Sequence, residues 1–378
     1  MINRELTTET LRVGNDFPVL ILTGPRQSGK TTLCKMTFPD YKYINLENPD
    51  IRDAIRVDPM SFLKGNPCGM ILDEAQQLPE LFSYIQVLVD EDKELRFVLS
   101  GSNNFTLMER ITQSLAGRAA LLTLLPLSIT EIKPDVTTDE LMFNGFYPAV
   151  WGDGRRPYDV YSNYYRTYIE RDLRQLINIK DLDLFRQFVR LMASRVANEF
   201  NASRISNEIG VDVKTVQHWL SILTTSYIAF TLPPYYRNIG KRIVKAHKLY
   251  FYDTGLVSYL LGLDSPEQVA LHPLRGALFE NMVVAEFYKR RFNQGKTPHL
   301  FYYRDNTQKE VDLIEEESFG QLFAYEIKSA KRFNTQFAAG IDYFKKLYGE
   351  SVVGGTILYD GDECIETSNI ICRNWRNL

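Results

Sequence analysis

The chain has 378 residues, of which 44% are hydrophobic and 24% are charged, and its formal net charge is −3. This length suggests two or three domains, the composition is that of an ordinary soluble globular protein, and the charge argues against a broadly basic nucleic-acid-binding surface. The four widely spaced cysteines exclude a disulfide framework and a zinc site, and the lack of a long apolar run or a signal-type N-terminus predicts a cytoplasmic protein with no membrane partner.

A glycine-rich loop follows an apolar run at 19–22 that predicts a buried strand. The loop fits the phosphate-binding pattern G-x-x-x-x-G-K-[ST], and a stretch able to form a helix comes after it; a chance glycine turn is the alternative. Backbone N–H groups of the loop and helix would surround phosphate oxygens, while Lys30 reaches the β- and γ-phosphates and Thr31 offers its hydroxyl to Mg²⁺. The predicted nucleotide-binding residues of this segment are Gly24, Pro25, Arg26, Gln27, Ser28, Gly29, Lys30, Thr31 and Thr32.

Two carboxylates close the next short apolar stretch, at 69–72. Behind a phosphate loop, Asp73 is placed to hold Mg²⁺ together with Thr31. Glu74 is placed to polarise the attacking water as a general base. A solvated acidic strand end is the alternative, and the preceding phosphate loop disfavours it.

Strands and helices alternate through residues 1 to about 130. Apolar runs at 19–22, 41–46, 70–72, 97–99 and 120–125 predict strands, with helical stretches between them, notably at 78–89. This alternation predicts a parallel sheet with helices on both faces. Ligands of such sheets lie beyond the carboxyl ends of the strands, so Ser100, Ser102 and Asn103 are candidates to face the γ-phosphate. A simple turn cluster explains these small polar residues equally well.

Arg118 comes directly before the last strand of this region. Gly117 is predicted to end the preceding helix, so Arg118 would lie at the C-terminal end of that helix. Compensation of the helix dipole is the simplest explanation for a basic residue there.

Several segments, taken together, resemble the prokaryotic AAA-type ATPases that carry a C-terminal domain of uncharacterised function. The resemblance covers nearly the whole chain, and it implies ATP and Mg²⁺ as cofactors. It also implies that Arg118 is an arginine finger that reaches the nucleotide of a neighbouring subunit, and hence a homo-oligomer; action within its own chain is the alternative. The segments are GPRQSGKTT at 24–32, LDEAQ at 72–76, SGSNNF at 100–105, SLAGR at 114–118, LPLS at 125–128 and GFYP at 145–148.

A connector is predicted at 131–180. Aromatic and charged residues at helical spacing over 158–177 indicate helices, which we expect to pack against the ATPase body. Arg171 is a candidate nucleotide sensor, although a surface ion pair within 170–172 is the favoured interpretation.

Residues 181–262 resemble a winged helix-turn-helix. A helix at 183–200, a short helix closed by Gly210 and a third helix capped by Asp212 form this signature, and 235–245 has the turn and basic residues of a wing. DNA is therefore a candidate partner, and a winged fold used for packing between protein domains is the alternative. The candidate DNA contacts are Lys214 and Gln217 for a major groove and Arg237, Lys241, Arg242 and Lys245 for phosphates.

The last third of the chain resembles the restriction-endonuclease-like core. A long helix from 275 to 291 precedes strands at 301–304, 310–314 and 323–328, a helix near 335–348 and a strand at 352–359. The motif of that core is an Asp on one strand and Glu-x-Lys on the next, which Asp312, Glu326 and Lys328 match. Glu280 matches a carboxylate that many members carry on the helix.

The residue types in this motif make chemical sense. Glu326 and Lys328 share a face because side chains alternate along a strand. Asp312 and Glu326 would bind a hard cation such as Mg²⁺ through oxygen, with Lys328 beside the phosphate to be cleaved. The alternative is a set of surface charges in a domain that has lost activity.

The sequence thus predicts an α/β chain of four regions: a P-loop NTPase parallel sheet at 1–130, a helical connector at 131–180, a winged helix-turn-helix at 181–262 and a C-terminal restriction-endonuclease-like α/β domain at 263–378. The leading hypothesis is an ATP-binding and ATP-hydrolysing AAA-type switch coupled to a DNA-binding winged helix and a nuclease-like domain. The rival is a nucleotide-dependent protein-interaction module with a degenerate, non-cleaving nuclease fold, which the net charge favours.

Overall fold

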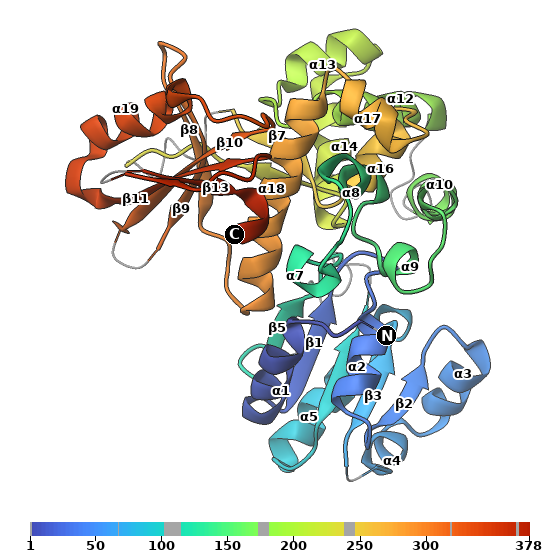
Figure 1. Ribbon diagram of the computed structural model, residues 1–378. Coiled ribbons are helices and arrows are strands. Elements are labelled where there is room, and N and C mark those ends of the chain that lie inside the picture. The colour runs from blue at the N-terminus through green and yellow to red at the C-terminus, as the bar shows by residue number, and fades with distance from the viewer. Residues whose placement is uncertain are drawn as a thin grey trace. The chain divides into compact units, whose positions relative to one another are not determined.

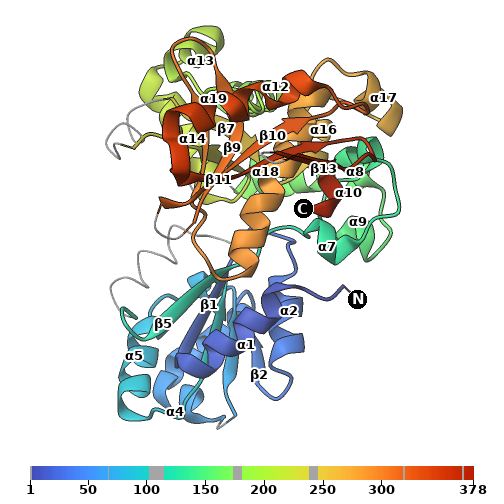
Figure 2. The same cartoon turned by 60° about the vertical axis from the view of Figure 1, so that its left-hand side comes forward.

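The computed structural model describes residues 2–66, 68–101, 115–172, 181–237, 246–317, 320–367 and 370–378, except for the side chains at 171 and 172. The chain forms two compact units, shown in two views in Figures 1 and 2. The first comprises Met1–Ile132, Thr225–Tyr227 and Lys289–Thr297, and the second Lys133–Thr224, Ile228–Tyr288 and Pro298–Leu378. No helix within these described ranges is long and apolar enough to cross a membrane. The candidate residues outside the described part are Ser102, Asn103, Lys241, Arg242, Lys245 and the side chain of Arg171.

The first unit is built on a five-stranded sheet with the strand order β2-β3-β4-β1-β5. Every neighbouring pair is parallel, which confirms the predicted parallel sheet. Because all five strands point the same way, the segments after β1, β3 and β4 meet at one edge of the sheet. The strands are β1 (Val19–Thr23), β2 (Lys42–Asn45), β3 (Met70–Asp73), β4 (Phe97–Ser100) and β5 (Ala119–Thr123).

Helices cover both faces of this sheet, as Figures 1 and 2 show. Successive side chains of β1 point to opposite faces, so Val19 and Ile21 belong to one hydrophobic cluster and Leu20 and Leu22 to another. The first cluster includes buried residues of α3 (Pro49–Val57), α4 (Pro59–Lys64) and α5 (Leu81–Glu91). The second includes those of α1 (Leu6–Asp16) and α2 (Lys30–Thr37). The unit also contains α7 (Ile129–Ile132).

Short helices open the second unit, namely α8 (Thr138–Asn144), α9 (Pro148–Trp151), α10 (Pro157–Tyr164) and the π-helical stretch Tyr165–Asp172. Helices were predicted here, but their predicted packing partner was the ATPase body, whereas the structure groups them with C-terminal residues. Buried hydrogen bonds explain this grouping. The Phe146 N–H donates to Asp253 Oδ2 at 2.6 Å, and Ser258 Oγ donates to Met142 O at 3.2 Å, which ties these helices to α16 (Thr254–Leu260).

Three helices and a two-stranded antiparallel sheet follow: α12 (Leu182–Ser194), α13 (Ala202–Ile209), α14 (Val213–Thr225), β6 (Ala229–Leu232) and β7 (Lys248–Phe251). The predicted boundaries between α13 and α14 are correct, since Gly210 ends α13 at φ +79° and Asp212 Oδ1 accepts the Thr215 N–H at 2.9 Å. The helix predicted at 183–200 is wrong at its end. It stops at Ser194 because the chain turns to pair with β7, where the Ala197 N–H donates to Leu249 O at 2.8 Å.

A mixed sheet with the order β12-β13-β11-β10-β9-β8 forms the rest of the second unit. In it, β10 is antiparallel to β9 and parallel to β11. The α18 helix (Arg275–Asn293) precedes the sheet, and α19 (Ala339–Tyr348) packs Ile341 and Phe344 into a cluster with Ile314 and Ile357. The strands are β8 (Leu300–Arg304), β9 (Glu310–Glu316), β10 (Leu322–Lys328), β11 (Val352–Tyr359) and two that were not predicted, β12 (Ile365–Glu366) and β13 (Ile371–Asn374); the remaining helix is α17 (Pro266–Leu271).

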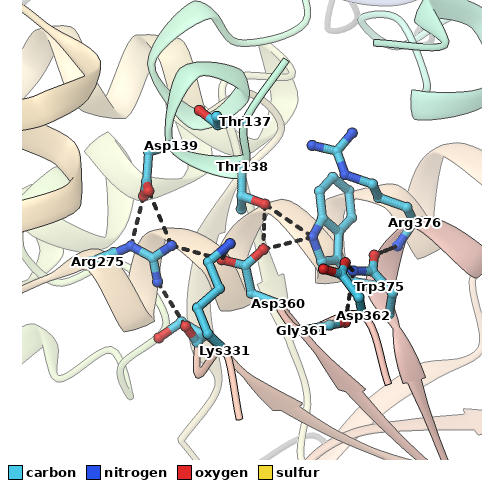
Figure 3. Close-up of polar contacts among 12 residues, drawn as sticks. Thr137, Thr138, Asp139, Arg275, Lys331, Asp360, Gly361, Asp362, Trp375 and Arg376 are labelled. Carbon is cyan, nitrogen blue, oxygen red and sulfur yellow. Dashed lines mark hydrogen bonds and ion pairs between the residues drawn. The ribbon is translucent and has the colours of Figure 1, made fainter. Parts of the chain in front are cut away.

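A polar network joins the predicted connector to the predicted C-terminal domain (Figure 3). The Arg275 guanidinium donates to Asp139 Oδ1 at 2.6 Å and to Asp360 Oδ2 at 2.8 Å. Asp360 also accepts the Thr138 hydroxyl and pairs with Lys331 at 2.9 Å. Residues that the sequence assigned to separate regions therefore belong to one folded unit.

Replacing Arg275 by methionine should lower the free energy of unfolding by about 3 kcal/mol, because it removes the less exposed of the two cations that pair with the buried Asp360 carboxylate and also the partner of Asp139. Asp360 is 3% exposed. Lys331→Met is the matched control: Lys331 contacts the same carboxylate, but its side chain is 66% exposed, so the loss should be below about 1 kcal/mol. Urea unfolding measures both, and equal losses would contradict this account of the network.

Candidate nucleotide site and acidic cluster

The phosphate loop begins where β1 ends, at the carboxyl edge of the first sheet. Its backbone is left-handed at three positions, Gly24, Gln27 and Gly29, with φ values of +141°, +62° and +94°. A Cβ on Gly24 would lie 2.1 Å from Leu124 O, so only glycine fits there. The loop leads directly into α2, whose first N–H groups and dipole favour an anion.

Two buried polar groups of this loop fit a bound phosphate. Lys30 is 7% exposed, and its Nζ donates to Gly24 O at 3.0 Å and to Pro25 O at 2.7 Å. Burial lowers the pKa of Lys30 to about 8, against the attraction of Glu74. The buried Ser28 hydroxyl makes no hydrogen bond to any residue that the structure describes. Because buried polar groups are normally hydrogen-bonded, a buried hydroxyl with no partner among the described residues, in the same loop as a buried ammonium, fits a site for phosphate oxygens.

Arg4 supports the loop, and sequence analysis did not identify it. Its guanidinium donates to Ser28 O at 2.6 Å and to Leu125 O at 2.7 Å, and it pairs with Glu131 at 3.0 Å. These contacts tie the phosphate loop to the segment after β5. Arg4 is 24 residues before Ser28 and belongs to no motif, so only the folded structure reveals that it contacts the phosphate loop.

Asp73, at the end of β3, is held by three hydroxyl groups. Its Oδ2 accepts from Thr31 Oγ1 and from the Tyr43 hydroxyl, both at 2.8 Å, and its Oδ1 accepts from the Ser100 hydroxyl. The two residues predicted to hold Mg²⁺, Thr31 and Asp73, are therefore adjacent, and their oxygens suit a hard cation. Ser100 was a candidate for the γ-phosphate, and here its hydroxyl contacts Asp73. Tyr43 was missed, because nothing in the sequence shows that β2 lies beside β3.

Glu74 lies next to Asp73 at the same edge of the sheet. It is a non-glycine residue in the left-handed region, at φ +55°, and such strain costs about 1–3 kcal/mol and clusters at functional sites. Its Oε2 accepts from Gln76 Nε2 at 2.5 Å. Burial raises the pKa of the Glu74 carboxyl, with the Gln76 hydrogen bond opposing this. A carboxylate whose pKa is raised toward neutral is a better general base.

Arg118 lies at the opposite edge of the sheet from these residues. It precedes β5, which is parallel to β1 with Ala119 beside Val19, whereas the phosphate loop follows β1. Its Nε and Nη2 each donate to the Asp90 carboxylate at 2.7 Å, and Arg118 lowers the pKa of Asp90. The structure therefore does not bring Arg118 to the nucleotide site of its own chain.

One face of the mixed sheet brings together Asp312 of β9 and the side chains of Glu326 and Lys328 of β10. Lys328 Nζ lies 2.9 Å from Asp312 Oδ2 and 2.6 Å from Glu326 Oε2, and both carboxylates are buried. Burial and the charge of Asp312 raise the pKa of Glu326 to about 9. Although burial opposes it, the charge of Lys328 lowers the pKa of Asp312. Two carboxylates that compete for one proton fit a divalent cation, which would relieve their repulsion.

Glu280, the further metal ligand expected on α18, is already engaged. Its Oε1 accepts from Lys248 Nζ at 2.9 Å and from the Tyr250 hydroxyl at 2.6 Å. Within the described ranges, no group of three or more His, Cys, Asp or Glu residues is placed to hold a metal ion. The structure thus brings Asp312 and Glu326 together but gives Glu280 other partners.

The candidate DNA-contacting residues that the structure describes are on its surface. Lys214 and Gln217 are exposed on α14, whereas Val216 and Leu223 of the same helix are buried. Arg237 is also exposed, and its guanidinium lies 5.2 Å from the centre of the Tyr348 ring.

Three models of protein families match consecutive segments of the chain. Residues 16–133 match an AAA domain, 135–267 match a domain of unknown function (DUF8612), and 275–376 match another (DUF4143). An uncharacterized protein of Mycobacterium tuberculosis is 32% identical over 342 residues, which are 86% of this chain and 73% of that protein, and one of Mycobacterium bovis gives the same values. A Walker-type ATPase of Pyrococcus abyssi is similar in structure, with a TM-score of 0.48 and 15% identity over 69% of this chain and 96% of that one.

The parallel sheet, the phosphate loop and the AAA-domain match define the class of the first unit, which contains an AAA-type P-loop ATPase domain. At this identity and coverage, the chain belongs to the same family as the two mycobacterial proteins.

Proposed function

We propose that this protein hydrolyses ATP in a Mg²⁺-dependent reaction and acts as a molecular switch. The observation that carries this proposal is the convergence of Lys30, the Thr31–Asp73 hydrogen bond and Glu74 at one edge of the sheet. Phosphate binding, metal binding and water activation would each have a group within this small region. Turnover of ATP with and without duplex DNA tests the proposal and its coupling to DNA.

Each side chain of the site has a distinct role in this proposal. Lys30 turns from the Gly24 and Pro25 carbonyls to the β- and γ-phosphates, and Ser28 donates its free hydroxyl to a phosphate oxygen. Thr31 and Asp73 hold Mg²⁺, which when bound offsets the phosphate charge. Glu74 accepts a proton from the attacking water. The hydroxyl groups of Tyr43 and Ser100 keep the Asp73 carboxylate in place.

We propose further that Arg118 acts on the nucleotide of a neighbouring subunit in a homo-oligomer. Its position at the edge of the sheet remote from its own phosphate loop supports action in trans over action in cis. Arg118→Ala should lower turnover about 10³-fold, the scale of arginine-finger losses in other nucleotide hydrolases. Mixing Arg118→Ala with Lys30→Ala protein should restore part of it, since each supplies what the other lacks. A monomeric protein with full turnover would rule out this role.

For the second unit we propose a divalent-cation site at Asp312 and Glu326, with Lys328 beside the phosphate of a nucleic acid that is bound by Lys214 and Gln217 of α14 and by Arg237. Bound metal would supply Lewis-acid chemistry there. The burial of both carboxylates and their shared contact with Lys328 support this.

Asp312→Ala in the full chain should abolish Mn²⁺ binding to the second unit, because it removes half of the ligand pair. Lys328→Met is the matched control for binding: it should keep the metal, since an ammonium is not a ligand, and should abolish DNA or RNA cleavage. Calorimetry and a nuclease assay in Mg²⁺ and Mn²⁺ make the measurements. Metal binding without cleavage in the wild type would favour the rival proposal, a non-cleaving fold that docks a partner.

A further inference from the structure

Lys248, the first residue of β7, carries a buried ammonium group that neither the motif nor the predicted roles include. The residue is 3% exposed. Its Nζ lies 2.9 Å from Glu280 Oε1 on α18 and 2.5 Å from Glu310 Oε1 on β9. A single ammonium therefore bridges the helix carboxylate and a strand carboxylate.

Both carboxylates have a second polar partner, which fixes them in this arrangement. The Tyr250 hydroxyl donates to Glu280 at 2.6 Å, and the Arg304 guanidinium lies 3.2 Å from Glu310 Oε2. Tyr250 is on the same strand as Lys248 and is two residues further on, so both side chains leave β7 on one face. The strand β7 thus contributes one cation and one hydroxyl to the acidic cluster, which consists of Glu280, Glu310, Asp312 and Glu326.

The bridge belongs to the same cluster as the proposed metal pair. Glu310 and Asp312 are two residues apart on β9 and share a face of the sheet. Opposed by burial, the attraction of Glu280, of Glu310 and of Asp312 raises the pKa of Lys248 well above its ordinary value, which keeps it charged. Without this ammonium, the negative charges of Glu280 and Glu310 would repel the carboxylate of Asp312.

A divalent cation and a lysine ammonium can each neutralise the carboxylate charges of this cluster, but a metal ion can dissociate and the ammonium cannot. The ammonium is covalently fixed, and removing one partner of such a buried pair is strongly destabilising. A metal ion could bind Glu280 and Glu310 only by displacing Lys248. Asp312 and Glu326, in contrast, share Lys328, whose side chain is 32% exposed and so borders solvent, whereas that of Lys248 is 4% exposed.

We infer that Lys248 is a built-in cation of the acidic cluster: it takes the place of a second metal ion, holds Glu280 and Glu310, and leaves Asp312 and Glu326 as the pair open to metal. The inference deepens the proposed cation site and rests on it for the identity of the open pair. Lys248 is a positioning residue in this arrangement and does not touch the substrate. Because Lys248 belongs to β7, the arrangement of the acidic cluster depends on a strand that precedes the segment with the motif.

The test is the number of Mn²⁺ ions bound per full-length chain, measured by electron paramagnetic resonance without nucleotide and in an Asp73→Asn background that removes the ligand of the first unit. Lys248→Met should bind one more Mn²⁺ than the wild-type residue, because Glu280 and Glu310 become available. Lys248→Arg should bind no more than wild type, because it retains the cation. Adding Glu280→Gln to Lys248→Met should abolish the gain.

A second variant covers the case in which Lys248→Met does not fold. Lys248→Gln removes the cation but keeps a polar side chain at this position, and it should likewise gain one Mn²⁺ through Glu280 and Glu310. No gain of Mn²⁺ in a folded variant overturns the inference about Lys248. A wild-type chain that binds no Mn²⁺ overturns the proposed pair of Asp312 and Glu326 instead, so the two failures are distinct.

Discussion

Substitution of Lys30 by alanine is expected to abolish detectable ATP binding. The side chain is the buried cation of the phosphate loop, and its ammonium is held within the loop by Gly24 and Pro25 carbonyls. Hydrogen bonds to charged groups are worth ~1.5–3 kcal/mol each, so loss of contacts to two phosphates weakens binding by about 100-fold or more. Calorimetric titration with ATP measures the affinity directly.

Lys93→Ala is the matched control for this change. It also removes a lysine from the first unit, but that side chain is 73% exposed and pairs only loosely with Asp90, at 3.9 Å. ATP affinity should be unchanged in this control. An affinity that falls equally in both variants, or in neither, would contradict the place given to Lys30.

Glu74→Gln should separate binding from hydrolysis. The amide cannot accept the proton of the attacking water, so turnover should fall by about 10²–10⁴-fold, the usual contribution of a general base. The affinity for ATP should stay the same, because Lys30, Thr31 and Asp73 are untouched. Steady-state phosphate release and calorimetry together give the two quantities.

Glu91→Gln is the control for the lost carboxylate. This side chain is 59% exposed and pairs with Lys64 at 3.7 Å, on the far end of α5. Its turnover should equal that of the wild type. Full turnover by Glu74→Gln would remove Glu74 from the reaction, and loss of ATP binding would show that it serves binding instead.

The first unit could be predicted in detail because its signals are local. Short apolar runs define β1 to β5, and the phosphate loop is a single contiguous motif whose glycines are required by left-handed backbone at Gly24 and Gly29. The strand order could not be predicted, because β2-β3-β4-β1-β5 is set by packing between distant segments. Tyr43 reaches Asp73 only through that order, and for this reason the sequence did not reveal it.

The sequence also predicted only those members of the acidic cluster that belong to a recognisable motif. Asp312, Glu326 and Lys328 lie on neighbouring strands of a motif with regular spacing, and the structure brings them within hydrogen-bonding distance. Lys248 is far from them in the sequence and carries no motif of its own, so its pairing with Glu280 was invisible. The same limit explains why the connector was expected to pack on the ATPase body: Arg275 and Asp360 hold it from a region more than a hundred residues away.

ATP turnover by the purified full-length chain tests the central claim most directly. Phosphate release is measured with ATP and Mg²⁺, with ATP and excess chelator, and with the Lys30→Ala variant as the background. The account predicts release that requires Mg²⁺ and disappears in the variant. Wild-type protein that neither binds ATP in calorimetry nor releases phosphate above that background would contradict it.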